Sequence, residues 1–587
     1  MSRYGTGLNA GALKLRVYNN FRGVDFTGGD VDYSRSPDAL NMWKNYSHLG
    51  KLIETRPGIS QELALDGDVF GLFFYEVNNA KHIIIHAGVK LYDYNMSTHL
   101  KTTIKASGMK PARSVGFVFN NILFIKDGLN YYEYNGTTIK EVEGYVPNIA
   151  IHKLIDGQTE MVQEANLLTD YVREQFIPDG EKTLYKLSQT QIQDVSVWDI
   201  SGVTPVEITT GFTTDLVNGE IEFNTAPTES YMATIEIKYK KDSDGRATAD
   251  KCKLACVFDN RVFMSGNIDH PNLLVWSGLN NPRYIANTSY TTLGNDAANV
   301  KALVPGNNAL WSFKEPSHSN TTIFYSTPYE VYDGKLDQTI KTYSTAHSSI
   351  TTGCKNTGIN FNDDIVFISE YGLEGISSNI TTEQVIAHRS SLVDSKMLNC
   401  SGEPVLVEWK GYLLIIYGNE VFLADSRQKV GNGDHMEYEW FYWDLLHNIK
   451  SAVVIDNKLY LGTTAVNGVS KVYVMDDTEY ALIDSYWTTK QDDFDYPQML
   501  KTTNKKGFKV NVANLFTSYN TDLKIETKLD NNDFEELATL TNTKGFVVTK
   551  IKKKKWTTIQ LKFSSTIPFG IYEATLESYI GSYVKRS

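Results

Sequence analysis

The chain has few cysteines, whose disulfides stabilise many small proteins, and its apolar runs are short compared with those that span membranes. Four cysteines occur in 587 residues, and the longest aliphatic runs, such as 413–416, fall far short of the ~20 apolar residues of a membrane helix. Only 15 prolines and 42 glycines stand beside 35 tyrosines, 26 phenylalanines and 9 tryptophans. This composition excludes a collagen-like or disordered chain and predicts a folded protein of two to four domains without a membrane segment.

Cationic residues and paired cysteines are also scarce. Lys and Arg total 57 against 69 Asp and Glu, a net charge of −12, which argues against a generally basic protein that coats nucleic acid. Cys252 and Cys256 lie in a strand-like segment, where positions i and i+4 are roughly 13 Å apart and beyond disulfide reach. Buried reduced thiols are therefore predicted.

What the sequence does contain is a repeated hairpin. Seven segments share an alternating apolar strand, a tight polar turn and a second apolar strand. The turns hold Asn-Asn, Asp-Asn, Asn-Asp or Lys-Gly, residues that tolerate the positive φ angles of tight hairpins. One marker residue for each turn is Asn79, Asn121, Asn260, Asn308, Asp363, Gly411 and Asn457.

The spacing of these turns predicts the fold class. The markers recur every 40–55 residues once an insertion at 152–250 is set aside. That period is typical of the blades of a β-propeller. We therefore predict an all-β protein: a six- or seven-bladed β-propeller with an inserted immunoglobulin-like β-sandwich and a C-terminal β-sandwich.

Composition shifts along the chain predict five segments. The insertion opens with a stretch at 161–176 that reads as helical and continues in short alternating strands. The first 60 residues fit neither pattern and are expected to run along a surface or to reach into a neighbouring subunit. The predicted segments are an extended N-terminal arm at 1–60, the first part of the propeller at 61–151, the inserted sandwich at 152–250, the second part of the propeller at 251–484 and the C-terminal sandwich at 485–587.

Motifs that carry catalysis or hold cofactors are missing. Gly5–Ala10 matches G-x-G-x-x-A but has no strand before it, and neither a phosphate-binding loop nor HExxH occurs. His82 and His86 lie on one strand and are not expected to converge on a metal ion. The aspartates at 492–495 do not fit a calcium loop, and no opposed pair of acids marks a propeller glycosidase. We predict no catalytic residue, no cofactor, no metal and no enzymatic activity.

Several stretches resemble a known family. FRGVDFTGGDVDYSRSPDALNMWKN at 21–45 and LIETRPGI at 52–59 resemble the opening of bacteriophage packaged-DNA stabilization or tail nozzle (tail hub) proteins. RVFMSGNIDHPNLLVWSGLNNPRYI at 261–285 resembles a second hallmark of that group, and SYWTTKQDDFDYP at 485–497 resembles the start of its terminal domain. The resemblance extends over most of the chain as scattered motifs.

The resemblance implies a non-enzymatic virion structural protein. Family members form a hexameric ring below the portal and adaptor, which extends or seals the DNA channel and permits genome ejection. Double-stranded DNA would pass through the lumen without sequence-specific binding, in a phage tail assembled in the host cytoplasm. The predicted assembly-interface residues are Arg22, Arg35, Arg56 and Trp43, with an intrachain ion pair as the open alternative for each arginine.

Charge distribution fits a channel wall and leaves one alternative function. Residues 485–587 hold 16 Lys and Arg against 11 Asp and Glu, so residues 1–484 carry −17. An acidic propeller body would repel phosphates and let DNA slide. The basic run at 550–556 is interpreted as a solvated strand edge. The alternative is a tail-tip adhesion protein that binds host polysaccharide through its β-sandwich modules. Trp198 or Trp487 could then serve as exposed sugar platforms, although a core position is the default interpretation for a tryptophan.

Overall fold

The computed structural model gives a chain built almost entirely of β-strands. It describes residues 13–48, 52–155, 157, 162–243, 245–317, 320–333, 338–348, 350–378, 384–430, 437–515, 522–541, 545–549 and 555–583. Within these ranges the helices are two short ones, α1 (Gly245–Asp250) and α2 (Asp394–Met397), beside many small, mostly antiparallel sheets. The predicted all-β class is confirmed. The chain forms two compact units, Met1–Leu72 with Asn356–Ser587, and Phe73–Lys355.

All seven predicted hairpin turns are present. Each is a two-residue loop in which both residues have positive φ, between 48° and 76°. The strands pair directly around these loops, as Phe119 does with Ile122 and Ile455 with Lys458. Asn, Asp and Gly bear this left-handed geometry with little strain, which is why these residues mark the turns. The loops are 78–79, 120–121, 259–260, 307–308, 362–363, 410–411 and 456–457.

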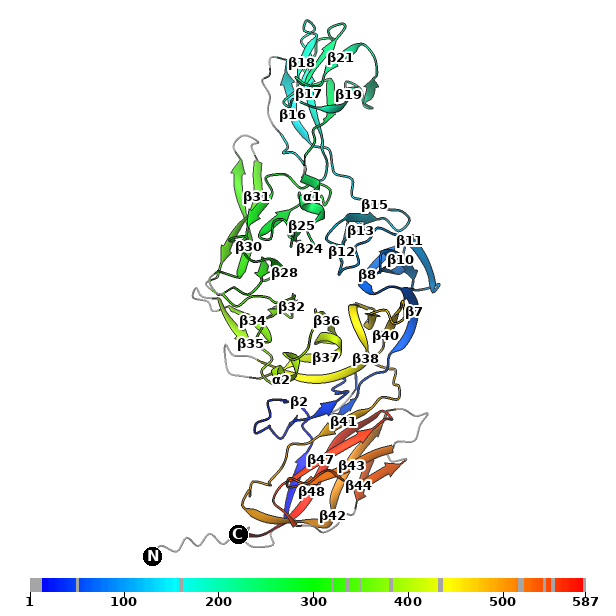
Figure 1. Cartoon of the computed structure of the whole chain (residues 1–587), viewed down its shortest axis with the longest axis vertical. Helices are drawn as coiled ribbons and strands as arrows, with labels where there is room; N and C mark the ends of the chain where they lie inside the picture. The colour runs from blue at the N-terminus through cyan, green and yellow to red at the C-terminus, as the bar shows by residue number, and fades with distance from the viewer. Residues whose placement is uncertain are drawn as a thin grey trace, which may run out of the picture. The chain divides into compact units, whose positions relative to one another are not determined.

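Four antiparallel sheets of four consecutive strands lie between residues 69 and 347 (Figure 1). They are β8 (Val69–Val77), β9 (Ala80–Ala87), β10 (Lys90–Asn95) and β11 (Leu100–Lys105); β12 (Val115–Phe119), β13 (Ile122–Lys126), β14 (Tyr131–Tyr134) and β15 (Ile139–Glu141); β24 (Leu254–Phe258), β25 (Arg261–Ser265), β26 (Leu273–Trp276) and β27 (Tyr290–Thr292); and β28 (Val300–Gly306), β29 (Ala309–Lys314), β30 (Ile323–Asp333) and β31 (Gln338–His347).

Consecutive sheets of the unit Phe73–Lys355 share buried cores. Phe73 and Tyr75 of the first sheet belong to one apolar cluster with Leu123 and Ile125 of the second. Similar clusters join the second sheet to the third and the third to the fourth. Each sheet therefore buries its apolar faces against its neighbours in the chain, as alternating strands require.

The insertion forms a module with its own core. A five-stranded sheet in the order β16-β17-β23-β19-β20 and a three-stranded sheet in the order β18-β22-β21 share a buried cluster that includes Phe176 and Tyr239. The strands are β16 (Asn148–Leu154), β17 (Tyr171–Ile177), β18 (Leu184–Lys186), β19 (Gln193–Asp199), β20 (Val206–Ile208), β21 (Phe212–Asp215), β22 (Glu220–Phe223) and β23 (Ile235–Lys240). The module thus begins at Asn148, a few residues before the predicted boundary at 152.

The predicted helical stretch at 161–176 is wrong. Residues 162–170 form turns and bends, and β17 begins at Tyr171. Val172, Glu174 and Phe176 point inward in strict alternation, which is the period of a strand. This alternation is not evident in the sequence, because position 174 points inward but holds a glutamate instead of an apolar residue. Its carboxylate accepts hydrogen bonds from Lys153 Nζ at 2.6 Å and Tyr239 OH at 2.5 Å.

Two further sheets lie in the other unit, between residues 358 and 475. One holds four consecutive strands, and the other has the order β36-β37-β38-β39-β40-β7. The long strands β37 and β38 bend at Gly418 and Leu446, which have φ of 61° and 62°. The strands are β32 (Gly358–Phe361), β33 (Asp364–Ile368), β34 (Leu373–Ser378), β35 (Gln384–His388), β36 (Val405–Trp409), β37 (Tyr412–Val430), β38 (Glu437–Ile455), β39 (Lys458–Thr463), β40 (Val469–Met475) and β7 (Ser60–Asp66). The early strand β7 therefore completes the last of these sheets.

Two sheets near the C-terminus take strands from the first 55 residues. In the seven-stranded sheet, β1 and β6 both pair with β48; in the five-stranded sheet, β4 pairs with β41. The sheets consist of β1 (Leu13–Tyr18), β5 (Met42–Trp43), β6 (Ile53–Thr55), β42 (Met499–Asn514), β45 (Gly545–Thr549), β46 (Lys555–Trp556) and β48 (Phe569–Tyr583), and of β4 (Ala39–Leu40), β41 (Ser485–Thr488), β43 (Asp522–Leu529), β44 (Glu535–Thr541) and β47 (Ile559–Ser565). The parallel pair β2 (Gly23–Val24) and β3 (Arg35–Ser36) lies outside them.

This arrangement differs from the predicted segments in one respect. The segment predicted as an extended arm at 1–60 supplies strands to the sandwich predicted at 485–587. Edge strands of two or three residues, such as β4 and β5, carry too little alternation to be recognised in a sequence. Of the basic run at 550–556, residues 550–554 lie outside the described residues, and Trp556 is buried.

Candidate functional site

The four predicted interface residues lie in one N-terminal segment. We call residues 13–58 the N-terminal strap; residues 49–51 within it are outside the described residues. The strap contributes β1, β4, β5 and β6 to the two C-terminal sheets, and β2 and β4 also contact β38. Its side chains therefore reach both the C-terminal sandwich and the sheet that β7 completes.

Arg22 and Arg35 converge on Glu439 of β38. Arg35 donates from Nε and Nη2 to the two carboxylate oxygens of Glu439, at 2.8 Å each. Arg22 Nη2 lies 2.7 Å from Glu439 Oε1. The Glu439 side chain is fully buried, so its charge depends on these cations for compensation.

Trp43 is part of a buried aromatic cluster. Its side chain is 1% exposed and stacks on Trp409, with ring centroids 5.6 Å apart and planes 7° from parallel. Trp443 meets it edge-on at 5.4 Å. Aromatic pairs of this geometry add stability beyond the area they bury. Trp43 thus attaches the strap to β36 and β38.

Arg56 is buried and bonded to main-chain oxygens. Its guanidinium donates to Asn41 Oδ1 and to the carbonyl oxygens of Pro57 and Asp444, at 2.8–2.9 Å. Burial lowers the pKa of Arg56 to about 10, and the charge of Asp444 partly opposes this. Arg56 therefore fixes the end of the strap where it passes β38.

The structure thus gives every predicted interface residue a partner within its own chain. For Arg22 and Arg35 this is the intrachain ion pair that the sequence left open as the alternative. Arg56 instead binds carbonyl and amide oxygens, and Trp43 packs in the core. Their role in contacts between subunits stays a prediction.

A fourth arginine of the strap, Arg16, was not anticipated from the sequence. Arg16 Nε lies 2.8 Å from Asp492 Oδ2, and Tyr18 OH donates to the same oxygen at 2.8 Å. Asp492 is fully buried; desolvation of the phenol, and then the negative charge of Asp492, raise the pKa of Tyr18. The aspartates at 492–495 stand out in the sequence as an acidic cluster, but no sequence feature indicates a partner 476 residues away.

Two more buried acids bind strap side chains. Tyr46 OH donates to Asp425 Oδ2 at 2.5 Å, and Ser47 Oγ donates to Asp477 Oδ2 at 2.8 Å. Both carboxylates belong to the region after residue 400 and are at least nine-tenths buried. The strap therefore meets four buried acids: Asp425, Glu439, Asp477 and Asp492.

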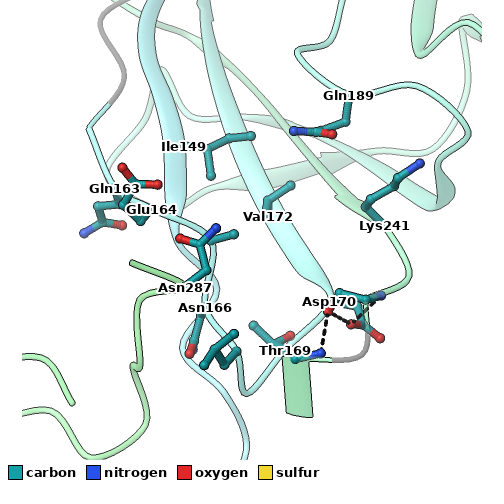
Figure 2. Close-up of a pocket in the computed structure, with 14 residues that line it drawn as sticks. Ile149, Gln163, Glu164, Asn166, Thr169, Asp170, Val172, Gln189, Lys241 and Asn287 are labelled. Carbon is teal, nitrogen blue, oxygen red and sulfur yellow. Dashed lines mark hydrogen bonds between the residues drawn. The ribbon is translucent and has the colours of Figure 1, made fainter. Parts of the chain in front are cut away.

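The unit Phe73–Lys355 contains a pocket of about 510 Å³ where the inserted module joins the sheets (Figure 2). Ile149 of β16 and Val172 of β17 form an apolar wall, and Asn287 and Lys241 lie at its sides. Asp170 accepts hydrogen bonds from the Ser243 amide and hydroxyl at 3.2 and 2.7 Å. The pocket can hold a small, partly apolar group.

The polar groups of this pocket are mostly committed to the fold. Lys241 Nζ donates to the Thr190 carbonyl at 2.7 Å. Asn166 donates to the carbonyls of Tyr145 and Arg283 and accepts from the Ile285 amide. These bonds fasten the insertion to the chain that follows β26. The pocket is thus a structural joint, and the described lining residues do not arrange a nucleophile beside a base.

Cysteines and histidines occupy ordinary structural positions. All four cysteines are free, as predicted, and burial raises the pKa of Cys252 to about 11 and of Cys256 to about 12. His82 Nδ1 lies 2.6 Å from Asp93, whereas His86 contacts Ser114 Oγ at 2.9 Å. The two rings thus have separate partners. Burial lowers the pKa of His86 to about 4.

The predicted sugar platforms have different surroundings. Trp487 is 2% exposed and meets Phe21 edge-on at 5.6 Å, so it is a core residue. Trp198 is partly exposed, and its Nε1 donates to Ser196 Oγ at 3.1 Å. Among the described residues, no group of three or more His, Cys, Asp or Glu side chains is placed to hold a metal ion. Nor is any helix in those ranges long and apolar enough to span a bilayer.

Comparison with known proteins gives no family. No family model and no curated protein matches the sequence. Among solved structures, the chain is similar to BamB from Moraxella catarrhalis, with a TM-score of 0.32, 11% identity and coverage of 71% of this chain and 97% of that one. It is also similar to Raptor from Chaetomium thermophilum, with a TM-score of 0.32, 7% identity and coverage of 73% of this chain and 30% of that one. These low scores carry no argument about function.

Proposed function

We propose that this chain is a non-enzymatic structural protein of a bacteriophage tail. Its place is a tail nozzle, a hub or a head-to-tail closure ring that extends or seals the DNA channel and permits genome ejection. In this proposal the protein assembles as a closed homo-oligomeric ring, a hexamer, and contacts a portal, an adaptor or other tail proteins. Double-stranded DNA passes through the lumen without sequence-specific contacts.

The observation that most supports this proposal is that residues in the family-like stretches stabilise the fold. Arg22 and Arg35 lie in the stretch that resembles the opening of tail nozzle proteins, and both neutralise the buried Glu439. Arg56, from the second family-like stretch, binds buried carbonyl oxygens. Residues that carry the resemblance thus hold the fold together, as expected of a protein whose task is mechanical.

The fold that goes with this proposal is the predicted six- or seven-bladed β-propeller. Seven hairpins with the same turn geometry begin seven groups of strands, and the bent strand β38 belongs to two of these groups. Pairing of β7 with β40 joins the start of the series to its end over Ser60–Asp66 and Val469–Val474. A propeller closed in this way has only short, protected edges and resists deformation.

The charge of the chain supports the passage of DNA. Residues 1–484 carry −17, and like charges repel phosphates at short range. A lumen lined by such a surface lets the duplex slide. Raising the salt concentration would screen this repulsion.

The oligomeric state of the full-length protein tests the proposal. Light scattering after gel filtration is expected to give a ring of several copies, and negative-stain images should show a central channel. Antibody labelling of intact particles should place the protein on the tail axis. A stable monomer at micromolar concentration, or label at the tail periphery, would contradict the ring.

A second candidate function is adhesion to host polysaccharide through the inserted module. The observation in its favour is an exposed apolar surface at the end of the module where β19 leads into β20: Tyr231 is 94% exposed and Met232 70%, and Val203 is fully exposed. The Ile200 amide donates to the Thr234 carbonyl, which brings the two loops together. Binding of purified host polysaccharide that is lost in Tyr231→Ser but kept in Tyr290→Ser would favour adhesion.

A further inference from the structure

The N-terminal strap lies far from its partners in the sequence and precedes them. Four buried acids that it meets lie between residues 425 and 492. The strand that pairs with β1 is β48, whose paired residues are Ala574–Tyr579. These partners therefore all follow the strap in the chain.

Two of these acids, Glu439 and Asp492, depend strongly on the strap. Among the described residues, Glu439 has Arg22 and Arg35 as its side-chain partners. Asp492 has Arg16 and Tyr18, beside its bond from the Phe494 amide. A buried carboxylate whose cation is removed is strongly destabilised, because the low-dielectric interior offers it neither the hydration that water gives nor another positive charge.

We propose that the N-terminal strap is a closing device, whose docking completes the C-terminal sandwich and packs against β38 in the sheet formed by β36–β40 and β7. While the strap is undocked, Glu439 and Asp492 draw in water and hold this region open. Docking supplies the cations and strands together, so that the region closes in one step. The device goes beyond the proposed role in a tail ring and does not rest on it, because every contact it uses lies within one compact unit.

Charge removal and charge rescue in the full-length protein test this device. The double variant Arg22→Met, Arg35→Met leaves Glu439 without a cation and keeps most of the apolar contact of the arginine stems. Chymotrypsin, which cleaves after aromatic residues, should then cut within residues 13–58 about tenfold faster or more, because proteolysis follows the population of the opened state. Adding Glu439→Gln removes the uncompensated charge and should restore most of the protection.

Two controls show whether the effect is confined to the strap. Arg283→Met removes the ion pair of Arg283 with Glu133 in the other unit, at 2.8 Å, and should leave cleavage of the strap unchanged. Cleavage within residues 73–355 should stay at the wild-type rate in all variants. Mass spectrometry of the N-terminal fragments reports where the chain is cut.

The outcomes separate the device from simple loss of stability. Strap cleavage at the wild-type rate in the double variant, or a double variant that Glu439→Gln does not rescue, would overturn it. If the double variant does not yield soluble protein, Arg16→Met and its rescue by Asp492→Asn repeat the test at β1. Equal acceleration of cleavage in both compact units would likewise overturn the proposal.

Discussion

At the scale of single residues, this chain relies on buried charges and on aromatic contacts between distant segments. Glu439 and Asp492 are fully buried and bound by arginines more than 400 residues away in sequence. Such pairs hold the structure in one arrangement, because removing either partner leaves a charge without compensation. Two residues, His388 and Trp43, show how such contacts respond to pH and to substitution.

His388 should make stability depend on pH. Its Nδ1 lies 3.0 Å from Glu374 and its Nε2 2.6 Å from Asp394. Hydrogen bonds to Asp394 and then Glu374 raise the pKa of His388 to about 10. Because this folded value lies above the ordinary ~6.5, the stabilisation is complete below about pH 6.5 and is lost as pH rises toward 10.

The variant His388→Gln checks this. Urea midpoints followed by tryptophan fluorescence should be lower than wild type at pH 6, and the decline between pH 7 and 10 should flatten. His270→Gln, at an exposed position, serves as the control and should keep the wild-type slope. An unchanged slope in His388→Gln would mean that other groups set the alkaline stability.

Truncating Trp43 should destabilise the unit to which the strap belongs. Trp43→Ala leaves a cavity beside Trp409 and is expected to cost about 3–5 kcal/mol, whereas Trp43→Phe should cost less. Thermal unfolding measures the difference. Tyr231→Ala, at a side chain 94% exposed, should change stability by less than about 0.5 kcal/mol. Equal effects at the two positions would contradict the packing described here.

At the scale of elements, turns were predictable and strand partners were not. The seven loops follow from local chemistry, because Asn, Asp and Gly accept positive φ and the flanking residues alternate. The pairing of β1 with β48 joins residues more than 550 positions apart, and no local pattern specifies it. The strand at 171–177 was read as helical because a buried glutamate occupies an inward position.

Asn308 tests the turn chemistry directly. Its φ is 58°, and it closes the hairpin of β28 and β29 with Asn307. Asn308→Val places a β-branched residue in left-handed geometry and should cost about 1–3 kcal/mol, whereas Asn308→Gly should be tolerated. Hydrogen exchange at the amides of Gly306 and Ala309 reports opening of this hairpin. Similar exchange rates in the two variants would show that the turn is not a determinant of its stability.

The candidate site, too, could be predicted from the sequence only in part. Arg22, Arg35 and Arg56 were named from the sequence, but their acceptors were not, since burial of Glu439 and the course of the strap emerge only in three dimensions. Arg16 was missed because it stands in an unremarkable alternating stretch. The pocket beside Asn166 was also not predicted, because its walls combine residues of the predicted insertion at 152–250 with Ile149 before it and Asn287 after it.

At the scale of the whole molecule, some parts should fold alone and others should not. Residues 146–243 enclose their own core, so this fragment is expected to unfold cooperatively on heating. Residues 485–587 lack β1 and β4–β6 and should remain unfolded when expressed alone. Circular dichroism of the two fragments checks this; a cooperative transition in 485–587 without residues 13–58 would contradict the shared sandwich.

The joint of the inserted module has a consequence for how such chains change over evolutionary time. The strands at which the module begins and ends, β16 and β23, flank the same strand β17, since Asn148 pairs with Arg173 and Tyr171 with Lys240. Replacing everything between these strands would alter neither the length nor the direction of the flanking segments. Related chains should therefore exchange modules at this position freely, and acquire new surfaces, while the frame on either side is inherited unchanged.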